Sequence, residues 1–258
     1  MKYSLPQLSL EKMLIGFTAL ITAITAGVST YVICSEIHRN NIKREANSNL
    51  DKIMKQQEDR LGISYDHIPK MKFKVPDDSS WVFAYYTSED DTIHFNSESL
   101  SYEGDSFVDS YINWLELYVK DYRIVLEHEL GHFYYDQFLE KQVITKEEIL
   151  NKKDDINGIR LISEGIAEYF ERTYSGEEDN FIDDEWPNDI NNLEGEETIR
   201  VIYSGGYHLV KPIIDKYGLN GIHHLIINPP KMKDLPDLPS YQQKILQFLM
   251  LKEEKLDP

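Results

Sequence analysis

The sequence is short of cysteine and of basic residues, and each shortage argues against a class of protein. Cys34 is the one cysteine among 258 residues, so an intramolecular disulfide is excluded, which fits either side of a prokaryotic membrane. Ile33, just before it, is not the small residue that a bacterial lipidation signal needs. The chain has 27 Lys and Arg residues against 45 Asp and Glu, a net charge of −18. This balance argues against nucleic acid as a partner.

Charged side chains are also missing from residues 13–34, a run of 22 residues rich in Ile, Leu, Ala, Val and Thr. A helix rises 1.5 Å per residue, so this run is long enough to cross a hydrocarbon layer of about 30 Å. We expect a single transmembrane helix that anchors the protein in a lipid membrane. A cleaved signal peptide is the alternative, with an apolar region of about 7–15 residues. Lysines and arginines are more numerous after the run, which favours a cytoplasmic catalytic domain and leaves the other side open.

The chain is expected to have three parts. Residues 1–34 contain the membrane span, and residues 35–65 are charged and helix-favouring, with apolar residues at spacings of mostly three to five. This second part is predicted to be a helical stalk or the first helix of the domain. Residues 66–258 remain for one globular domain with a hydrophobic core.

The most informative feature is the run His-Glu-Leu-Gly-His at residues 128–132. Residues four apart lie on one face of an α-helix, so His128 and His132 can reach one metal ion with Glu129 beside them. Apolar residues recur at helical spacing around the run and predict a helix over about residues 124–139. The pattern is typical of a zinc hydrolase. A buried, hydrogen-bonded histidine pair without a metal is the alternative.

A second pattern supplies a third ligand, which a catalytic zinc site needs while a fourth position stays open. Glu164 and Glu168 share one face of a helix predicted over about residues 156–173. We assign Glu164 to the metal and Glu168 to orienting a ligating histidine through its free ring N–H. Gly165 and Ala167 leave room for a second helix to approach closely. A solvated helix face that carries charges is the alternative.

These residues resemble the gluzincins, zinc peptidases of the thermolysin and membrane alanyl aminopeptidase type. Their H-E-x-x-H run is followed by a downstream glutamate ligand, and Ser-Glu-Gly-Ile-Ala at residues 163–167 matches the aminopeptidase string Asn-Glu-Gly-Phe-Ala closely. The resemblance covers about residues 80–225. It implies that His128, His132 and Glu164 are zinc ligands and that Glu129 is the general base. The third histidine that metzincins place after the H-E-x-x-H run is missing, which argues against that group. The Gly-x-Met-Glu-Asn string of aminopeptidases is missing too, so the sequence leaves open whether peptides are cleaved at their ends or internally.

The expected reaction is hydrolysis of a peptide bond in a peptide or protein substrate. Zinc lowers the pKa of a bound water to near 7, and Glu129 is placed to take its proton and pass it to the leaving amine. A donor to the developing oxyanion is expected from Tyr-Ser-Gly-Gly-Tyr-His at residues 203–208. This run resembles the start of the helix that follows the glutamate ligand in small gluzincin-like peptidases. We rank Tyr207 first, Tyr203 second and His208 third, with packing as the alternative for each.

Two β-rich runs, residues 80–86 and 92–96, are separated by the turn-like residues 88–91 and predict a hairpin. In zincin folds the strand before the metal-binding helix is a sheet edge that pairs with extended substrate. Residues 93–96 are the candidate for this edge. The alternative is an ordinary hairpin strand with His94 facing solvent.

Residues 177–197 hold ten acidic residues and no basic residue. This segment is interpreted as a flap that favours basic substrates, a calcium-binding loop, or a plain solvated loop. The paired histidines His223 and His224 are expected on the surface.

The sequence therefore predicts an α+β, zincin-like metallopeptidase domain with an N-terminal transmembrane helix, a small sheet, metal-binding helices and a helical C-terminal part. The predicted function is that of a single-pass, membrane-anchored zinc metallopeptidase. Two other functions stay open. One is a membrane-tethered binding or scaffold protein that kept the zincin shell without turnover, and the other is a zinc hydrolase acting on a substrate other than a peptide.

Overall fold

A computed structural model describes residues 40–73, 84–96, 107–142, 156–176 and 200–254, with side chains from residue 122 onward in the third of these ranges. The chain divides into two compact units, Met1–Glu45 and Ala46–Pro258. The second unit contains every candidate site residue. Residues 46–61 belong to it as well, so the unit begins earlier than the predicted boundary at residue 66. The predicted membrane span at residues 13–34 and the acidic segment 177–197 lie outside the described residues.

The described β structure is one sheet of three short strands, β1 (Lys70–Phe73), β2 (Ala84–Thr87) and β3 (Thr92–Phe95). β2 and β3 form the predicted antiparallel hairpin, with Tyr86 opposite Ile93. The turn between them contains Asp91 at φ 49°, a left-handed conformation that Asp tolerates better than most residues.

The position of β3 in the sheet corrects the prediction that residues 93–96 form the substrate-binding edge. The strand order is β1-β3-β2, so β3 is the central strand, parallel to β1 and antiparallel to β2. Its backbone groups are engaged on both sides. The error arose because β1 reads as a weak strand, alternating Lys and apolar residues over only four positions. β1 pairs with β3 between residues 22 positions apart, from Lys70 with Thr92 to Phe73 with Phe95, and no local pattern predicts such a pairing.

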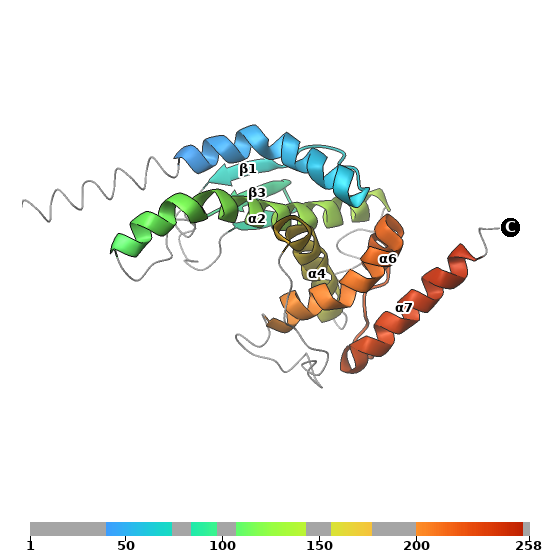
Figure 1. Cartoon of the computed structure of the whole chain (residues 1–258). Helices are drawn as coiled ribbons and strands as arrows, with labels where there is room; N and C mark the ends of the chain where they lie inside the picture. Colours follow the sequence, from blue (N-terminus) through green and yellow to red (C-terminus); the bar gives the residue numbers. More distant parts are fainter. Residues whose placement is uncertain (1–39, 74–83, 97–106, 143–155, 177–199, 255–258) are drawn as a thin grey trace, which may run out of the picture. The chain divides into compact units, whose positions relative to one another are not determined.

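Two helices carry the candidate ligands. α2 (Phe107–Lys141) contains the predicted helix 124–139 and extends it mainly at its N-terminal end, and α4 (Ile156–Ser175) matches the predicted helix 156–173 within two residues. Both are labelled in Figure 1. They pack directly against each other, which is what brings their polar residues together.

α2 separates two hydrophobic clusters. On one side Leu126, Leu130 and Phe133 pack with the sheet and with Leu50, Ile53 and Met54 of the helical segment 46–61. On the other side Tyr134 and Phe138 pack with α4 and with the C-terminal helices. The apolar positions of residues 46–61 are therefore covered within the second unit, which favours the interpretation of this segment as the first helix of the domain.

The C-terminal part is helical, as expected. It consists of a π-helical turn η5 (Val201–Gly205), α6 (Gly206–Ile227), a 3₁₀ turn η6 (Leu235–Asp237) and α7 (Leu238–Glu253). The backbone of Gly218 leaves the helical region at φ 53° and ψ −130°, which puts a kink inside α6. The chain resumes a helix beyond this kink.

Glycines set the spacing between the three helices around the site. A Cβ added to Gly131 would lie 2.6 Å from the Cα of Ala167, so α2 and α4 approach at this point with no space for a side chain. A Cβ on Gly165 would lie 2.4 Å from the carbonyl oxygen of Gly206, where α4 meets α6. The predicted close helix approach at Gly165 and Ala167 is present at both residues.

Among the described helices, none combines the length and the apolar composition that a membrane span requires.

Candidate metal centre

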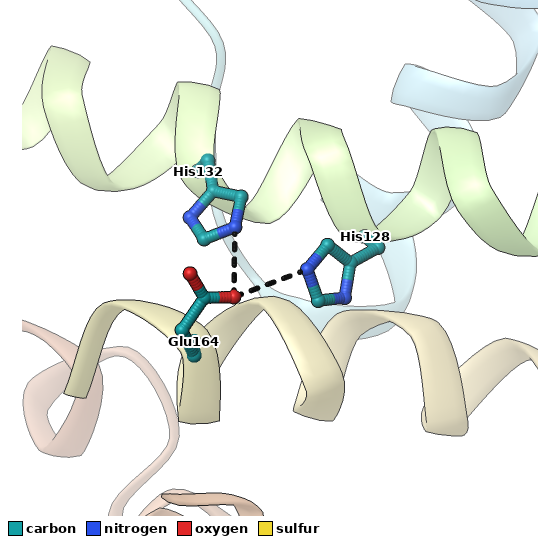
Figure 2. Close-up of side chains that lie close together, drawn as sticks. All are labelled: His128, His132 and Glu164. Atoms are coloured by element: carbon teal, nitrogen blue, oxygen red, sulfur yellow. Dashed lines mark ion pairs between the residues drawn. The ribbon is translucent and has the colours of Figure 1, made fainter. Parts of the chain in front are cut away.

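The three predicted ligands lie together. α2 places His128 and His132 one turn apart, and α4 places Glu164 opposite them. The Oε2 atom of Glu164 lies 3.4 Å from Nε2 of His128 and 3.3 Å from Nε2 of His132. Figure 2 shows the two imidazoles of α2 and the carboxylate of α4 pointing toward one another.

The spacing of these atoms fits a tetrahedral zinc ion. Zinc ligand bonds of about 2.0–2.1 Å at tetrahedral angles separate neighbouring ligand atoms by about 3.3–3.4 Å. The three ligand atoms lie within 4.8 Å of one another. The Oε2 atom of Glu164 is buried and has no hydrogen-bond partner. An unsatisfied, buried carboxylate oxygen that faces two ring nitrogens is the chemistry of a cation site.

The electrostatics of the group favour a negative carboxylate and a positive partner. Burial alone would raise the pKa of Glu164, but the imidazoles of His128 and His132 close to its carboxylate outweigh it and hold this pKa well below its usual range. Burial opposes the charge of His128 too, and yet Glu164 and Glu171 raise the pKa of its imidazole well above the usual value. The site therefore stabilises positive charge at the position that a metal ion would occupy.

The outer nitrogens of both histidines have oxygen partners. Nδ1 of His128 lies 3.2 Å from Oε2 of Glu171 and 3.5 Å from Oε1 of Glu168. Nδ1 of His132 lies 3.0 Å from the Ser163 hydroxyl. A proton on Nδ1 leaves the Nε2 lone pair for a metal, so these contacts orient each ring with Nε2 toward Glu164.

Glu171 is a site residue that the sequence analysis missed. Glu168, which was assigned to orient a histidine, is near His128, but its Oε2 accepts a hydrogen bond from Nε of Arg172 at 2.8 Å. Burial, with Glu171 next, raises the pKa of Glu168. Glu171 lies seven residues after Glu164 and hence on the same helix face, a spacing that could have identified it. Ser163, the first residue of the Ser-Glu-Gly-Ile-Ala run, was not predicted to have a role in the site.

Glu129 is buried between the ligands and the sheet. Its Oε2 has no hydrogen-bond partner, and the backbone N–H of Tyr86 on β2 lies beside its carboxylate. Burial raises the pKa of Glu129, while the two histidines oppose this rise. A carboxylate with a raised pKa and a vacant oxygen is suited to accept and return a proton.

Of the predicted oxyanion donors, Tyr203 contacts a ligand. Its ring stacks on that of His128 with 5.8 Å between centroids and 15° between planes. Burial, followed by the charge of Glu164, raises the pKa of its phenol, which keeps the O–H as a donor. Tyr203 lies in the π-helical turn η5, and π-helical turns are frequent at functional sites because the extra residue turns side chains away from regular register.

The structure places Tyr207, ranked first by sequence, in a different environment. Tyr207 is buried, with the guanidinium of Arg172 4.7 Å above its ring and Tyr169 6.4 Å away. The ring of His208 lies 5.6 Å from that of Tyr207.

A polar network holds α2 one residue before His128. Glu127 is fully buried and accepts hydrogen bonds from Gln57 at 2.6 Å and from Arg60 at 2.8 Å, while Arg123 lies 3.3 Å from its other oxygen. Arg60 also contacts the Phe170 carbonyl of α4 at 3.4 Å. A buried carboxylate with three donors resists displacement, so this network fixes α2 relative to α4.

The chain matches no family model, no curated protein and no solved structure in comparisons with known proteins. The arguments for its function are therefore those of residue chemistry and geometry.

Proposed function

We propose that this chain is a zinc metallopeptidase with a zincin-like α+β domain, anchored in a membrane by residues 13–34. The observation that carries the proposal is the buried Oε2 of Glu164, which has no hydrogen bond and lies 3.3–3.4 Å from the inner nitrogens of two histidines. His128, His132 and Glu164 would hold the ion. When bound in such a site, zinc polarises a substrate carbonyl and lowers the pKa of water.

The other residues of the site have separate tasks in the proposal. Glu129 accepts a proton from the attacking water through its vacant oxygen and delivers it to the leaving amine. Tyr203, beside His128, donates its phenol proton in a hydrogen bond to the carbonyl oxygen as negative charge develops there. Glu171 and Ser163 hold the two imidazoles in orientation.

A peptide substrate would add to the sheet at β2 rather than at β3. In the described part of the chain β2 is paired on one side, by β3, and its Tyr86 backbone lies next to Glu129. An extended peptide hydrogen-bonded to this strand would pass the general base. This pairing favours a peptide as the substrate class over a small ester or amide.

The test is zinc analysis of the purified full chain together with a peptide-library digest, for the unaltered protein and for Glu129→Gln. We expect one zinc per chain in both, and a loss of cleavage by several orders of magnitude in Glu129→Gln, because the base is deleted and the ligands are kept. Glu140→Gln is the matched control, an exposed glutamate at the end of the same helix. It should cleave normally.

The outcomes separate the alternatives. Cleavage sites distinguish removal of terminal residues from internal cleavage. One zinc per chain without cleavage of any peptide contradicts the peptidase proposal, and points to a scaffold protein or to another substrate. Undiminished cleavage by Glu129→Gln contradicts the role of that residue.

A further inference from the structure

A cavity lies at the C-terminal end of α2, apart from the candidate metal centre. Its volume is about 450 Å³, within the range of small-molecule sites. The end of α2, the helices α6 and α7 and the segment 62–64 line it. His128, His132 and Glu164 do not line it. The cavity is therefore independent of the site described above.

Basic groups surround this cavity in a chain that is otherwise strongly acidic. Lys141 and Lys252 lie at its wall with His223 and His224, and the described residues that line it include no carboxylate. Lys141 also pairs with Asp66 at 2.9 Å. Lys252 has no carboxylate within ion-pair distance among the residues that the structure describes. In a protein of net charge −18, a cavity with this lining is a local exception.

The histidines are half-buried, and they are packed against aromatic rings rather than lying free on the surface as expected from sequence. His223 stacks on Phe138 with 3.9 Å between centroids, and its Nε2 lies 2.9 Å from the Tyr134 hydroxyl. Burial, and then Lys141, lowers the pKa of His223. Burial, and then Lys252, lowers that of His224. Each imidazole thus has a lysine nearby.

The rest of the wall is apolar. Phe138, Leu219, Ile227 and Leu249 line the cavity beside the basic groups. A ligand that fits this wall has an apolar body, and a ligand that fits the lysines has a negative head. An uncharged apolar molecule would leave the charge of Lys252 without a partner, and a bare inorganic anion would leave the apolar wall in water.

We propose that this cavity is a binding site for a small amphipathic anion, with a carboxylate or phosphate head between Lys141 and Lys252 and an apolar body against Phe138 and Leu249. The site is separate from the metal centre, but a ligand bound here contacts the same helix α2 that carries His128 and His132, nearer to its C-terminus. The proposal does not depend on the peptidase activity.

The test is calorimetric titration of the full chain, in lipid nanodiscs, with hexanoate, hexyl phosphate and hexanol. The three probes share a tail and differ in the head. We expect at least one of the two anions to bind at least about tenfold more tightly than hexanol, because charge-assisted hydrogen bonds to lysine are made by the anions alone. The stronger anion identifies the head group. Anion binding should also shift the NMR signals of His223 and His224.

The charge-removing variant is Lys141→Gln combined with Lys252→Gln, and the matched control is Lys216→Gln with Lys233→Gln, two exposed lysines outside the cavity. The charge-removing variant should bind the anion at least about tenfold more weakly and keep its zinc. The control should keep both its anion affinity and its zinc. Equal binding of hexanol and both anions, no binding of any probe, or full anion affinity in the first variant would overturn the proposal.

Discussion

At the scale of single residues, the arrangement around His128 fits two states, a metal site and a buried ion pair. Both ring nitrogens of His128 face carboxylates, Nδ1 toward Glu171 and Nε2 toward Glu164. Burying charged groups costs several kcal/mol each unless every one is well compensated. A divalent ion at Nε2 with a proton at Nδ1 would satisfy both carboxylates and give the buried oxygen of Glu164 a partner. Without a metal, a protonated imidazole would pair with that oxygen at 3.3–3.4 Å, so zinc analysis distinguishes the two states.

Glu168 and Glu171, the two carboxylates that face Nδ1 of His128, give the first prediction at this scale. Glu171→Ala should weaken zinc binding by about 10–100-fold, the usual effect of removing a group that orients a ligating histidine. Glu168→Ala should have the smaller effect, because Glu168 lies farther from Nδ1 and is engaged by Arg172. A chelator competition assay measures both. A larger loss in Glu168→Ala would restore the assignment made from the sequence.

Tyr203 and Tyr207 give the second prediction at this scale. Tyr203→Phe should lower kcat on a peptide substrate by about 10²–10³-fold, because it removes one donor to the oxyanion while its ring can still stack on His128. Zinc content and KM should change little. Tyr207→Phe is the matched control and should keep kcat. If Tyr207→Phe is the inactive variant, the donor is the residue that the sequence ranked first.

At the scale of elements, the site depends on how closely α2 and α4 approach. Each helix alone presents its polar residues on one face, but the 3.3 Å distance between His132 and Glu164 requires the contact at Gly131 and Ala167. The Glu127 network adds a second constraint just before His128. The ligand geometry is thus a property of a helix pair and not of one motif.

Gly131→Ala tests this dependence. Alanine favours a helix over glycine by about 1 kcal/mol, so propensity alone predicts a more stable protein. The added Cβ would meet backbone at 2.6 Å, however, and two packed helices must separate to accept it. We expect the cost of separating α2 from α4 to exceed the gain in helix propensity. The variant should then have a lower free energy of unfolding and a zinc affinity reduced at least tenfold. Stabilisation with unchanged zinc affinity would show that the contact is not needed.

Local signals explain why so much of these elements could be predicted. The spacing of His128, His132, Glu164 and Glu168 follows from the helical period, and the hairpin of β2 and β3 follows from alternating residues around a polar turn. The central position of β3 could not be predicted, because it depends on pairing with the distant β1. The choice between Tyr203 and Tyr207 depended on the π-helical turn at residues 201–205, which has no sequence signature.

At the scale of the whole molecule, the two sides of α2 have different chemistry. One side packs against the sheet, the side toward α4 carries the candidate metal centre, and the C-terminal end of the helix lines a basic, partly apolar cavity. That His223 and His224 line this cavity could not be predicted, because the helical period alone does not reveal which faces of α6 and α7 enclose one. Residues 46–61 were predicted to be a stalk or the first helix of the domain, and their apolar face is buried in the second unit.

The most direct measurement is the zinc content and zinc affinity of the full chain compared with Glu164→Ala, with Glu140→Ala as the exposed control. The account predicts one zinc per chain in the unaltered protein and in the control, and a sharp loss in Glu164→Ala, because one of three ligands is gone. Absence of zinc from the unaltered protein, or equal affinity in Glu164→Ala, would contradict the metal centre and the enzymatic function inferred from it.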